Sequence, residues 1–231
     1  MIGYINKLET FSTVDGPGVR VAVFMQGCSL RCKFCHNPET WKVNVGAKYT
    51  SKELLSVILK YKNYIEDGGV TFSGGEPLLQ SDFLLEILKL CKENNIHTCL
   101  DTSGTNFKNE EILLYTDLVI LDIKALDDNS YIDMTNKNME DFWLFLNICE
   151  KLKKQVWIRQ VIIPGINDNL EYVLNLKEKL KTFKCIEKIE LLPYHNMAIE
   201  KYEKLGIDYP LKGTLAMDKE KCMELQEKIG Y

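Results

Sequence analysis

Residues 19–37 of the chain read VRVAVFMQGCSLRCKFCHN. The first part, 19–26, is mostly apolar and rich in β-branched side chains, which predicts a buried β-strand. Cys28, Cys32 and Cys35 follow directly, in the pattern C-x3-C-x2-C. This stretch therefore predicts a strand that carries a loop of three thiols at its carboxyl end.

The same change from strand to helix pattern continues to the end of the chain. Strands are predicted at 19–26, 69–73, 97–101, 118–124, 156–163 and 188–193, and helices at 51–66, 81–95, 109–115, 139–154, 169–183 and 218–229. The strand segments are almost wholly apolar, as in parallel strands covered on both faces. The sequence thus predicts an α/β fold, a parallel sheet or barrel, in one domain of residues 1–231.

Composition narrows the class of protein. The chain has 231 residues, 45% of them hydrophobic and 27% charged, with a net charge of −4, which is typical of a soluble globular protein. That charge gives no basic field for nucleic acid, so we expect a large partner to be a protein. The chain shows neither an export signal nor an apolar run of about 18 residues, which predicts a cytoplasmic protein without a membrane span.

Eight cysteines in a reducing cytoplasm are not expected to form disulfides, so those that cluster suggest a metal. The five that do not cluster are predicted to be small buried hydrophobic residues; they are Cys91, Cys99, Cys149, Cys185 and Cys222.

The clustered thiols leave several interpretations open. Sulfur ligands suit an iron–sulfur cluster and zinc alike, and a [4Fe–4S] cluster on three thiolates would keep one iron open. A zinc site would need His36 to bend back beside Cys35. Residues 32–36 also match the C-x-x-C-H haem-attachment pattern, although Cys28 would then be unused. The weakest interpretation is that the three cysteines lie close together in the sequence by chance.

Polar or glycine-containing segments follow the predicted strands at 26–35, 73–77, 101–104, 122–124 and 193–196. The carboxyl ends of parallel strands meet at one edge, where such folds bind ligands. In the second segment, Gly74 and Gly75 allow a backbone to approach a ligand closely and are followed by Glu76.

Asp101, Thr102 and Asp122 offer hard oxygens for a cation, and Lys124 offers a charge for a carboxylate. The structural alternative is that Asp101 caps a helix and Asp122 pairs with Lys124. His195 is as often a hydrogen-bonded core residue as a ligand in such a place.

The cysteine pattern after the first strand, with Phe34 before the last cysteine, resembles the radical S-adenosylmethionine (SAM) superfamily. The resemblance implies a [4Fe–4S] cluster on Cys28, Cys32 and Cys35 whose open iron binds SAM and cleaves it to a 5′-deoxyadenosyl radical. The implied SAM contacts are Phe34, Cys35, His36, Gly74, Gly75, Glu76, Asp122, Ile123, Lys124 and His195. The resemblance also implies a monovalent cation on Asp101, Thr102 and Asp122.

The segments TVDGPG, CHNPETW, HTCLDTSG, DLVILDIK, VWIRQVIIPG and KIELLPYH, in this order, resemble the activating enzymes of glycyl-radical enzymes. Residues 36–72 hold no cysteine, whereas many such activators carry a ferredoxin-like insert there, so the branch acting on pyruvate formate-lyase is favoured. On composition alone, the glycine-proline turn at 13–20 would be a tight connection.

This resemblance implies a partial (β/α)6 barrel, open on one side, and a monomer that takes hydrogen from a glycine Cα of a glycyl-radical enzyme, pyruvate formate-lyase or a close relative, under anaerobic conditions. Flavodoxin or ferredoxin would donate the electron, and Asp15 and Arg159 would line the opening for the glycyl loop. The remaining hypotheses are a radical SAM enzyme with another peptide or small-molecule substrate, and a non-enzymatic zinc module.

Overall fold

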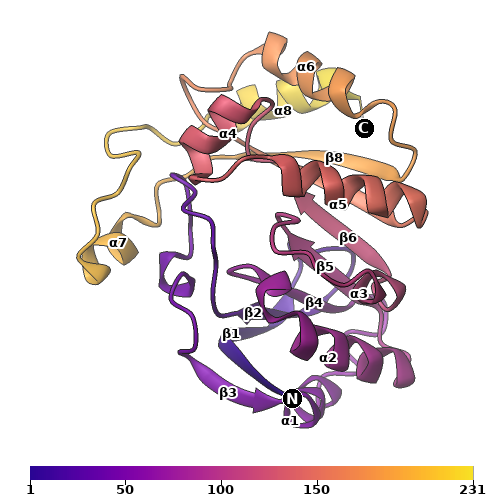
Figure 1. The fold of residues 1–231 in the computed structure, drawn as a ribbon. Coiled ribbons are helices and arrows are strands. Elements are labelled where there is room, and N and C mark those ends of the chain that lie inside the picture. The colour runs from indigo at the N-terminus through magenta and orange to yellow at the C-terminus, as the bar shows by residue number, and fades with distance from the viewer. Residues whose placement is uncertain (231) are drawn as a thin grey trace.

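A computed structural model describes residues 1–230 as one eight-stranded sheet with helices packed against it (Figure 1). The strand order is β3-β1-β2-β4-β5-β6-β7-β8. The strands are β1 Ile2–Ser12, β2 Arg20–Met25, β3 Ala47–Thr50, β4 Gly69–Gly74, β5 Thr98–Thr102, β6 Leu118–Asp122, β7 Gln155–Ile162 and β8 Ile186–Pro193. The helices are α1 Ser51–Leu59, α2 Ser81–Glu93, α3 Glu111–Leu114, α4 Asp128–Thr135, α5 Glu140–Lys151, α6 Leu170–Leu180, α7 Ile199–Leu205 and α8 Lys219–Ile229, with single 3-10 turns η1 Pro38–Thr40 and η2 Pro77–Gln80.

The strands predicted from sequence are β2 and β4 to β8, which lie side by side in chain order and are parallel. Because β3 and β8 are the two edges, the sheet does not close. The expected partial barrel, open on one side, is confirmed.

The expectation of six strands was incomplete, because β1 and β3 add an antiparallel ribbon beside β2. β1 has buried residues only at Gly3, Ile5 and Ser12, and β3 is a short edge strand with no buried residue, so neither has the continuous apolar run of a central strand. Helices α4 and α7 were also not predicted, and α1 ends at Leu59 rather than at residue 66.

The parallel strands place alternate side chains on two different faces. On β7, Val156 and Ile158 belong to the large apolar core beneath the helices. Trp157 lies on the opposite face, called the concave face here, where it packs against a small cluster of Cys99, Leu118 and Ile120. Further along the same strand the concave face is polar, since Arg159 lies two residues beyond Trp157. The concave face is therefore apolar in its middle and polar towards the carboxyl ends of the strands.

Arg20 closes the opposite end of the concave face. It is fully buried, and its guanidinium donates to Thr71 Oγ1 (2.6 Å), Gly68 O (2.7 Å) and Val70 O (2.8 Å). It also contacts His97 Nδ1 at 3.2 Å. These bonds connect the amino-terminal ends of β2, β4 and β5.

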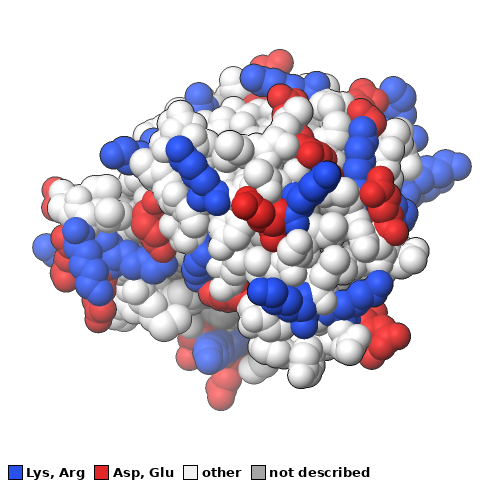
Figure 2. All heavy atoms as spheres, turned by 90° about the horizontal axis from the view of Figure 1, so that it is seen from below, with Lys and Arg blue, Asp and Glu red and all other residues white. Residues whose placement is uncertain are grey.

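On the face shown in Figure 2, lysine and arginine side chains are interspersed with aspartate and glutamate. Over residues 1–230, none of the helices has the length and apolar character needed to cross a bilayer. The scattered cysteines Cys91, Cys99, Cys149, Cys185 and Cys222 are all buried, as predicted.

Two glycines with positive φ allow the effect of close packing on stability to be distinguished from the effect of backbone strain. A Cβ on Gly69 (φ +129°) would lie 2.0 Å from His97 O, whereas a Cβ on Gly165 (φ +76°) would have no atom within 4 Å. We expect Gly165→Ala to lower the free energy of unfolding by about 1 kcal/mol. Gly69→Ala should lower it by more than about 3 kcal/mol, because β4 and β5 must separate. Urea unfolding under anaerobic conditions measures both, and equal losses would contradict the packing argument.

Candidate active site

A cavity of about 220 Å³ opens at the carboxyl ends of the parallel strands. It is lined by Cys28, Leu30, Cys32, Phe34, Cys35, His36, Asn37, Thr40, Ser73, Gly74, Gly75, Glu76, Asp101, Thr102, Ser103, Asp122, Lys124, Arg159, Val161 and Leu192. The segments that follow β2, β4, β5 and β6 thus meet in one place, as their position after the strands predicted.

Backbone hydrogen bonds hold the cysteine loop on both sides. Gly27 N donates to Thr40 O (2.7 Å), which closes the loop on itself. Arg31 N donates to Thr135 O and Lys33 N to Met134 O, both at 2.9 Å, which fixes the middle of the loop to α4. The loop is held by other segments on either side of its thiols.

The thiols are poor acids in this environment. Burial raises the pKa of Cys28 and of Cys32 to about 12, and it also raises the pKa of Cys35. A nearby Glu76 carboxylate adds to the effect on Cys28, while Lys124 opposes it at Cys32. The thiolates that metals require would thus form here only with a cation to compensate them.

Glu76 joins two strand ends. Its buried carboxylate accepts hydrogen bonds from Thr102 Oγ1, Ser103 N, Ser103 Oγ and Leu78 N. Burial raises the pKa of Glu76, although the bonds from Ser103 and Thr102 act in the opposite direction. Ser103, which sequence reasoning missed, directly follows the predicted Thr102.

Gly74 and Gly75 give close contact with protein backbone. A Cβ on Gly74 would lie 2.3 Å from Met25 N, and one on Gly75 would lie 2.2 Å from Gly27 O. The amides of Gly75 and Glu76 donate to Met25 O and Gly27 O, at 2.9 and 2.8 Å. The amides of Gly75 and Glu76 are therefore bonded to the end of β2 and the start of the cysteine loop.

The two aspartates have different partners. Lys124 Nζ lies 2.7 Å from Asp122 Oδ2 and 5.4 Å from the centre of the Phe34 ring. Burial alone would lower the pKa of Lys124, but the charges of Asp122 and Cys32 raise it above its usual value. Asp101 Oδ2 accepts from Ser73 Oγ (2.7 Å), so Asp101 does not cap a helix, whereas the structural alternative of an Asp122–Lys124 pair is present.

His195 lies beside the predicted SAM contact His36 rather than in the cavity wall. The two rings stack with centroids 3.8 Å apart, and His36 Nε2 lies 3.1 Å from His195 O. Burial lowers the pKa of both imidazoles, which favours their neutral forms. No group of three or more His, Cys, Asp or Glu side chains within residues 1–230 is placed to hold a single metal ion.

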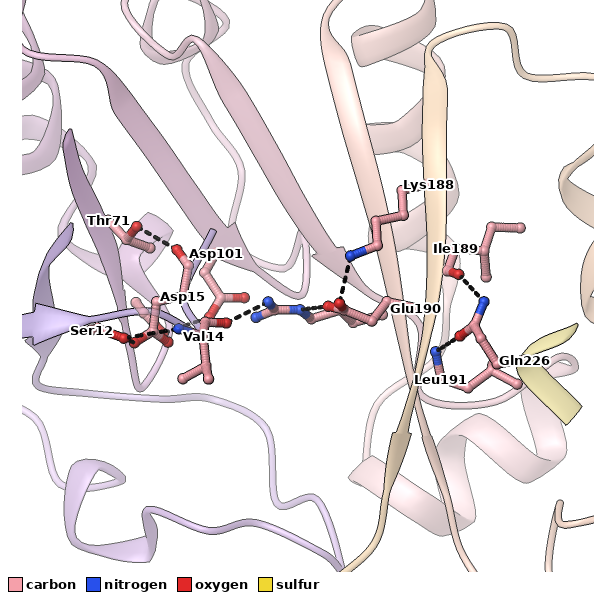
Figure 3. Close-up of polar contacts among 12 residues, drawn as sticks. Ser12, Val14, Asp15, Thr71, Asp101, Lys188, Ile189, Glu190, Leu191 and Gln226 are labelled. Atoms are coloured by element: carbon pink, nitrogen blue, oxygen red, sulfur yellow. Dashed lines mark hydrogen bonds and ion pairs between the residues drawn. The ribbon is translucent and has the colours of Figure 1, made fainter. Parts of the chain in front are cut away.

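Arg159 connects the segment before β2 with the last strand. Its Nη2 donates to Val14 O and its Nε to Glu190 Oε2, both at 2.7 Å, and Glu190 also pairs with Lys188 (Figure 3). Asp15 accepts a hydrogen bond from Ser12 Oγ and is buried. Arg159 lines the cavity, whereas Asp15 is not among the lining residues.

Two predicted contacts, Ile123 and His195, are not among the lining residues, and the side chain of Ile123 is buried in the core. The lining residues that sequence reasoning missed include Val161, Leu192 and Thr40. A signal existed for Val161, because it follows Arg159 by two positions and so lies on the same face of β7.

The donor set fits an iron–sulfur cluster. Three soft thiols come from one short loop, and the cationic Lys124 lies beside them to offset negative charge. The open α/β sheet is the fold of a radical SAM methyltransferase from Sphaerobacter thermophilus, which is 14% identical with a TM-score of 0.65 over 91% of this chain and 63% of that one.

Comparison with known proteins defines the family. The description "4Fe-4S single cluster domain" matches residues 14–141. The pyruvate formate-lyase-activating enzyme of Clostridium pasteurianum is 50% identical over 99% of this chain and 98% of its own length. A crystallised domain of pyruvate-formate lyase-activating enzyme from Bacteroides vulgatus ATCC 8482 is 26% identical, with a TM-score of 0.56, and the match covers 71% of this chain and 95% of that one. SuiB of Streptococcus suis, solved bound to SAM, has the same fold with a TM-score of 0.65, at 18% identity, over 87% of this chain and 44% of that one.

The chain belongs to the pyruvate formate-lyase-activating enzyme family. This membership confirms the resemblance found in the sequence and favours an iron–sulfur cluster over the zinc and haem alternatives.

Asp101 makes the stability of the protein depend on pH. Burial and the neighbouring Asp122 raise its pKa to about 7, against the attraction of Arg159 and the bond from Ser73. The folded state therefore keeps a proton that the unfolded state has lost, so this group lowers stability as the pH rises from about 4 to 7. We expect Asp101→Asn to flatten that fall, as measured by urea unfolding of iron-free protein at pH 5 and 7.5.

The matched control is Asp117→Asn, since hydrogen bonds and Lys92 lower the pKa of Asp117 against the effect of burial. That variant should lose the same amount of stability at pH 5 and at pH 7.5, because a pKa lowered from 3.8 changes the pH dependence only below about pH 4, so the fall should keep its wild-type size. If Asp101→Asn follows the wild-type pH dependence, Asp101 is not protonated in the folded state.

Proposed function

We propose that this chain activates pyruvate formate-lyase, or a close glycyl-radical enzyme, by reductive cleavage of SAM at a [4Fe–4S] cluster. The observation that carries the proposal is the meeting of three thiols, the Gly-Gly-Glu segment and the Asp122–Lys124 pair in one cavity. The 50% identity to an activating enzyme over nearly the whole chain supports the choice of partner.

In this proposal Cys28, Cys32 and Cys35 hold the cluster and leave one iron for the amino and carboxylate groups of SAM. When bound, the cluster supplies the electron that breaks a carbon–sulfur bond of SAM and yields the 5′-deoxyadenosyl radical. Lys124 would balance the SAM carboxylate, and a monovalent cation would lie on Asp101, Thr102 and Asp122. The further SAM contacts proposed are Phe34, His36, Gly74, Gly75, Glu76, Ile123 and His195.

The protein must also let the partner's glycyl loop enter the site while it protects the 5′-deoxyadenosyl radical. The sheet is open between β3 and β8, and Arg159 connects the segment at Val14 with β8 near the cavity. We therefore assign Asp15 and Arg159 to the opening through which the partner's loop reaches the site. The glycine Cα of that loop would there give up a hydrogen atom to the 5′-deoxyadenosyl radical, which leaves 5′-deoxyadenosine and the glycyl radical.

We also propose that residues 1–231 act as one domain, as a monomer in the cytoplasm of cells growing without oxygen, with flavodoxin or ferredoxin as the electron donor. A single large apolar cluster running from Ile5 to Ile229 supports the one-domain interpretation. The cysteine-free stretch 36–72 is consistent with one cluster, which an external donor would reduce.

The function is tested by incubating the anaerobically reconstituted, reduced protein with SAM and pyruvate formate-lyase and recording the EPR spectrum. We expect a glycyl doublet from the wild type and none from Cys32→Ala, which should also lose cluster iron and sulfide. Cys222→Ala, a matched buried cysteine on α8, should retain both. SAM cleavage without any glycyl doublet would instead favour another substrate, and zinc without iron would exclude the proposal.

Arg159→Gln tests the proposed opening. We expect the rate of glycyl-radical formation to fall about tenfold more than the rate of SAM cleavage without partner, since a charged hydrogen bond contributes about 1.5–3 kcal/mol. Lys188→Gln is the control, because Lys188 contacts Glu190 but not Val14. A parallel fall in both rates would place Arg159 in SAM binding instead.

A further inference from the structure

Tyr131 and Tyr202 are fully buried, and within residues 1–230 neither hydroxyl has a hydrogen-bond partner. Buried tyrosine hydroxyls usually have one, and leaving a donor unpaired costs about 1–3 kcal/mol. Phenylalanine would fill nearly the same volume without that cost. The two hydroxyls therefore need a partner that the described protein atoms do not supply.

Tyr131 lies on α4, which holds the middle of the cysteine loop. The carbonyls of Met134 and Thr135 accept from Lys33 N and Arg31 N, the two residues that flank Cys32. Tyr131 is one helical turn before Thr135, whose Oγ1 donates to Tyr131 O. Burial raises the pKa of Tyr131, with the next effects from the charges of Lys124 and Cys32.

Tyr202 lies on α7, which holds the end of the same loop. The neighbouring Lys201 Nζ donates to His36 O, Asn37 Oδ1 and Glu39 Oε1, at 2.8, 2.9 and 2.6 Å. The Tyr202 ring packs edge-on against Trp41 with centroids 5.7 Å apart. Burial raises the pKa of Tyr202 too, with the next effects from Cys35 and Cys32.

The two helices approach the violet segment of the cysteine loop from different sides (Figure 1). The other two unpartnered buried polar atoms of the described residues, Glu39 Oε2 and His195 Nδ1, belong to the same region. Glu39 follows the loop directly, and His195 stacks on His36. The unsatisfied polar atoms are thus concentrated around the thiols rather than spread through the core.

We propose that the hydroxyls of Tyr131 and Tyr202 donate hydrogen bonds to sulfur atoms of the cluster held by Cys28, Cys32 and Cys35, one from each side, and raise its reduction potential. The inference rests on the proposed function, because it requires that cluster. Hydrogen bonds to cluster sulfur stabilise the added negative charge of the reduced form, and they are a recognised means by which proteins set cluster potentials. The donors would make the cluster easier to reduce with a cellular electron donor.

The experiment compares wild type, Tyr131→Phe and Tyr202→Phe as whole chains, reconstituted anaerobically with iron and sulfide and titrated with dithionite and redox dyes in the absence of SAM. Each variant should keep its iron and sulfide. We expect at least a tenfold decrease in the equilibrium constant for one-electron reduction, which is a midpoint 59 mV more negative. ENDOR spectra of the reduced cluster should also lose one exchangeable proton coupling in each variant.

Tyr172→Phe is the matched control, because the Tyr172 hydroxyl lies on α6 and is bonded to Gln160 Oε1 (3.1 Å). It should leave the midpoint and the proton couplings unchanged. If a phenylalanine variant fails to bind iron, 3-fluorotyrosine at the same position, a stronger donor, should raise the midpoint.

The outcomes separate this inference from the proposed function. Loaded variants with wild-type midpoints and proton couplings would overturn the assignment of the hydroxyls while leaving the proposed function intact. Wild-type protein that binds no iron and sulfide would count against the proposed function itself.

Discussion

The close approach of two strand ends is the constraint on which the site depends. After β4, Gly75 lies so near the end of β2 that a Cβ would be 2.2 Å from Gly27 O, and the Glu76 amide bonds the same carbonyl. Any side chain at position 75 would separate the cysteine loop from β4. Glu76 then extends the connection to β5 by accepting from Thr102 and Ser103. A single glycine contact therefore begins a chain of hydrogen bonds across three strand ends.

Much of this arrangement could be predicted, because it follows from local pattern. The central strands are continuous apolar runs, and the chemistry-bearing segments follow them, so their meeting at one edge was expected. The close contact of Gly74 and Gly75 with the end of β2 was not predicted, since a Gly-Gly pair looks the same whether its open side faces a ligand or a neighbouring strand. Only the three-dimensional positions of Met25 and Gly27 distinguish the two.

The electrostatics of the cavity explain why it suits a positively charged occupant. Burial makes the Cys28 and Cys32 thiols reluctant to ionise and keeps a proton on Asp101 at a pH where carboxylates are normally charged. Lys124 compensates only part of the cost of placing negative charge here, because it is already paired with Asp122. Buried anions that are this costly alone become stable when iron or a monovalent cation is bound. The site is thus preorganised to favour binding of cations.

Sequence reasoning missed α4 and α7, the two helices that hold the cysteine loop, and the reason is physical. α4 and α7 have 8 and 7 residues, too short to be stable by propensity alone, so tertiary contacts must hold them in place. Those contacts are the backbone bonds to Arg31 and Lys33 on one side and the Lys201 bonds on the other. The same contacts place Tyr131 and Tyr202, so the positions of both side chains depend on the loop that α4 and α7 hold. Local sequence pattern identifies the ligands of the cluster, but the surroundings that set its properties come from contacts between residues distant in the chain.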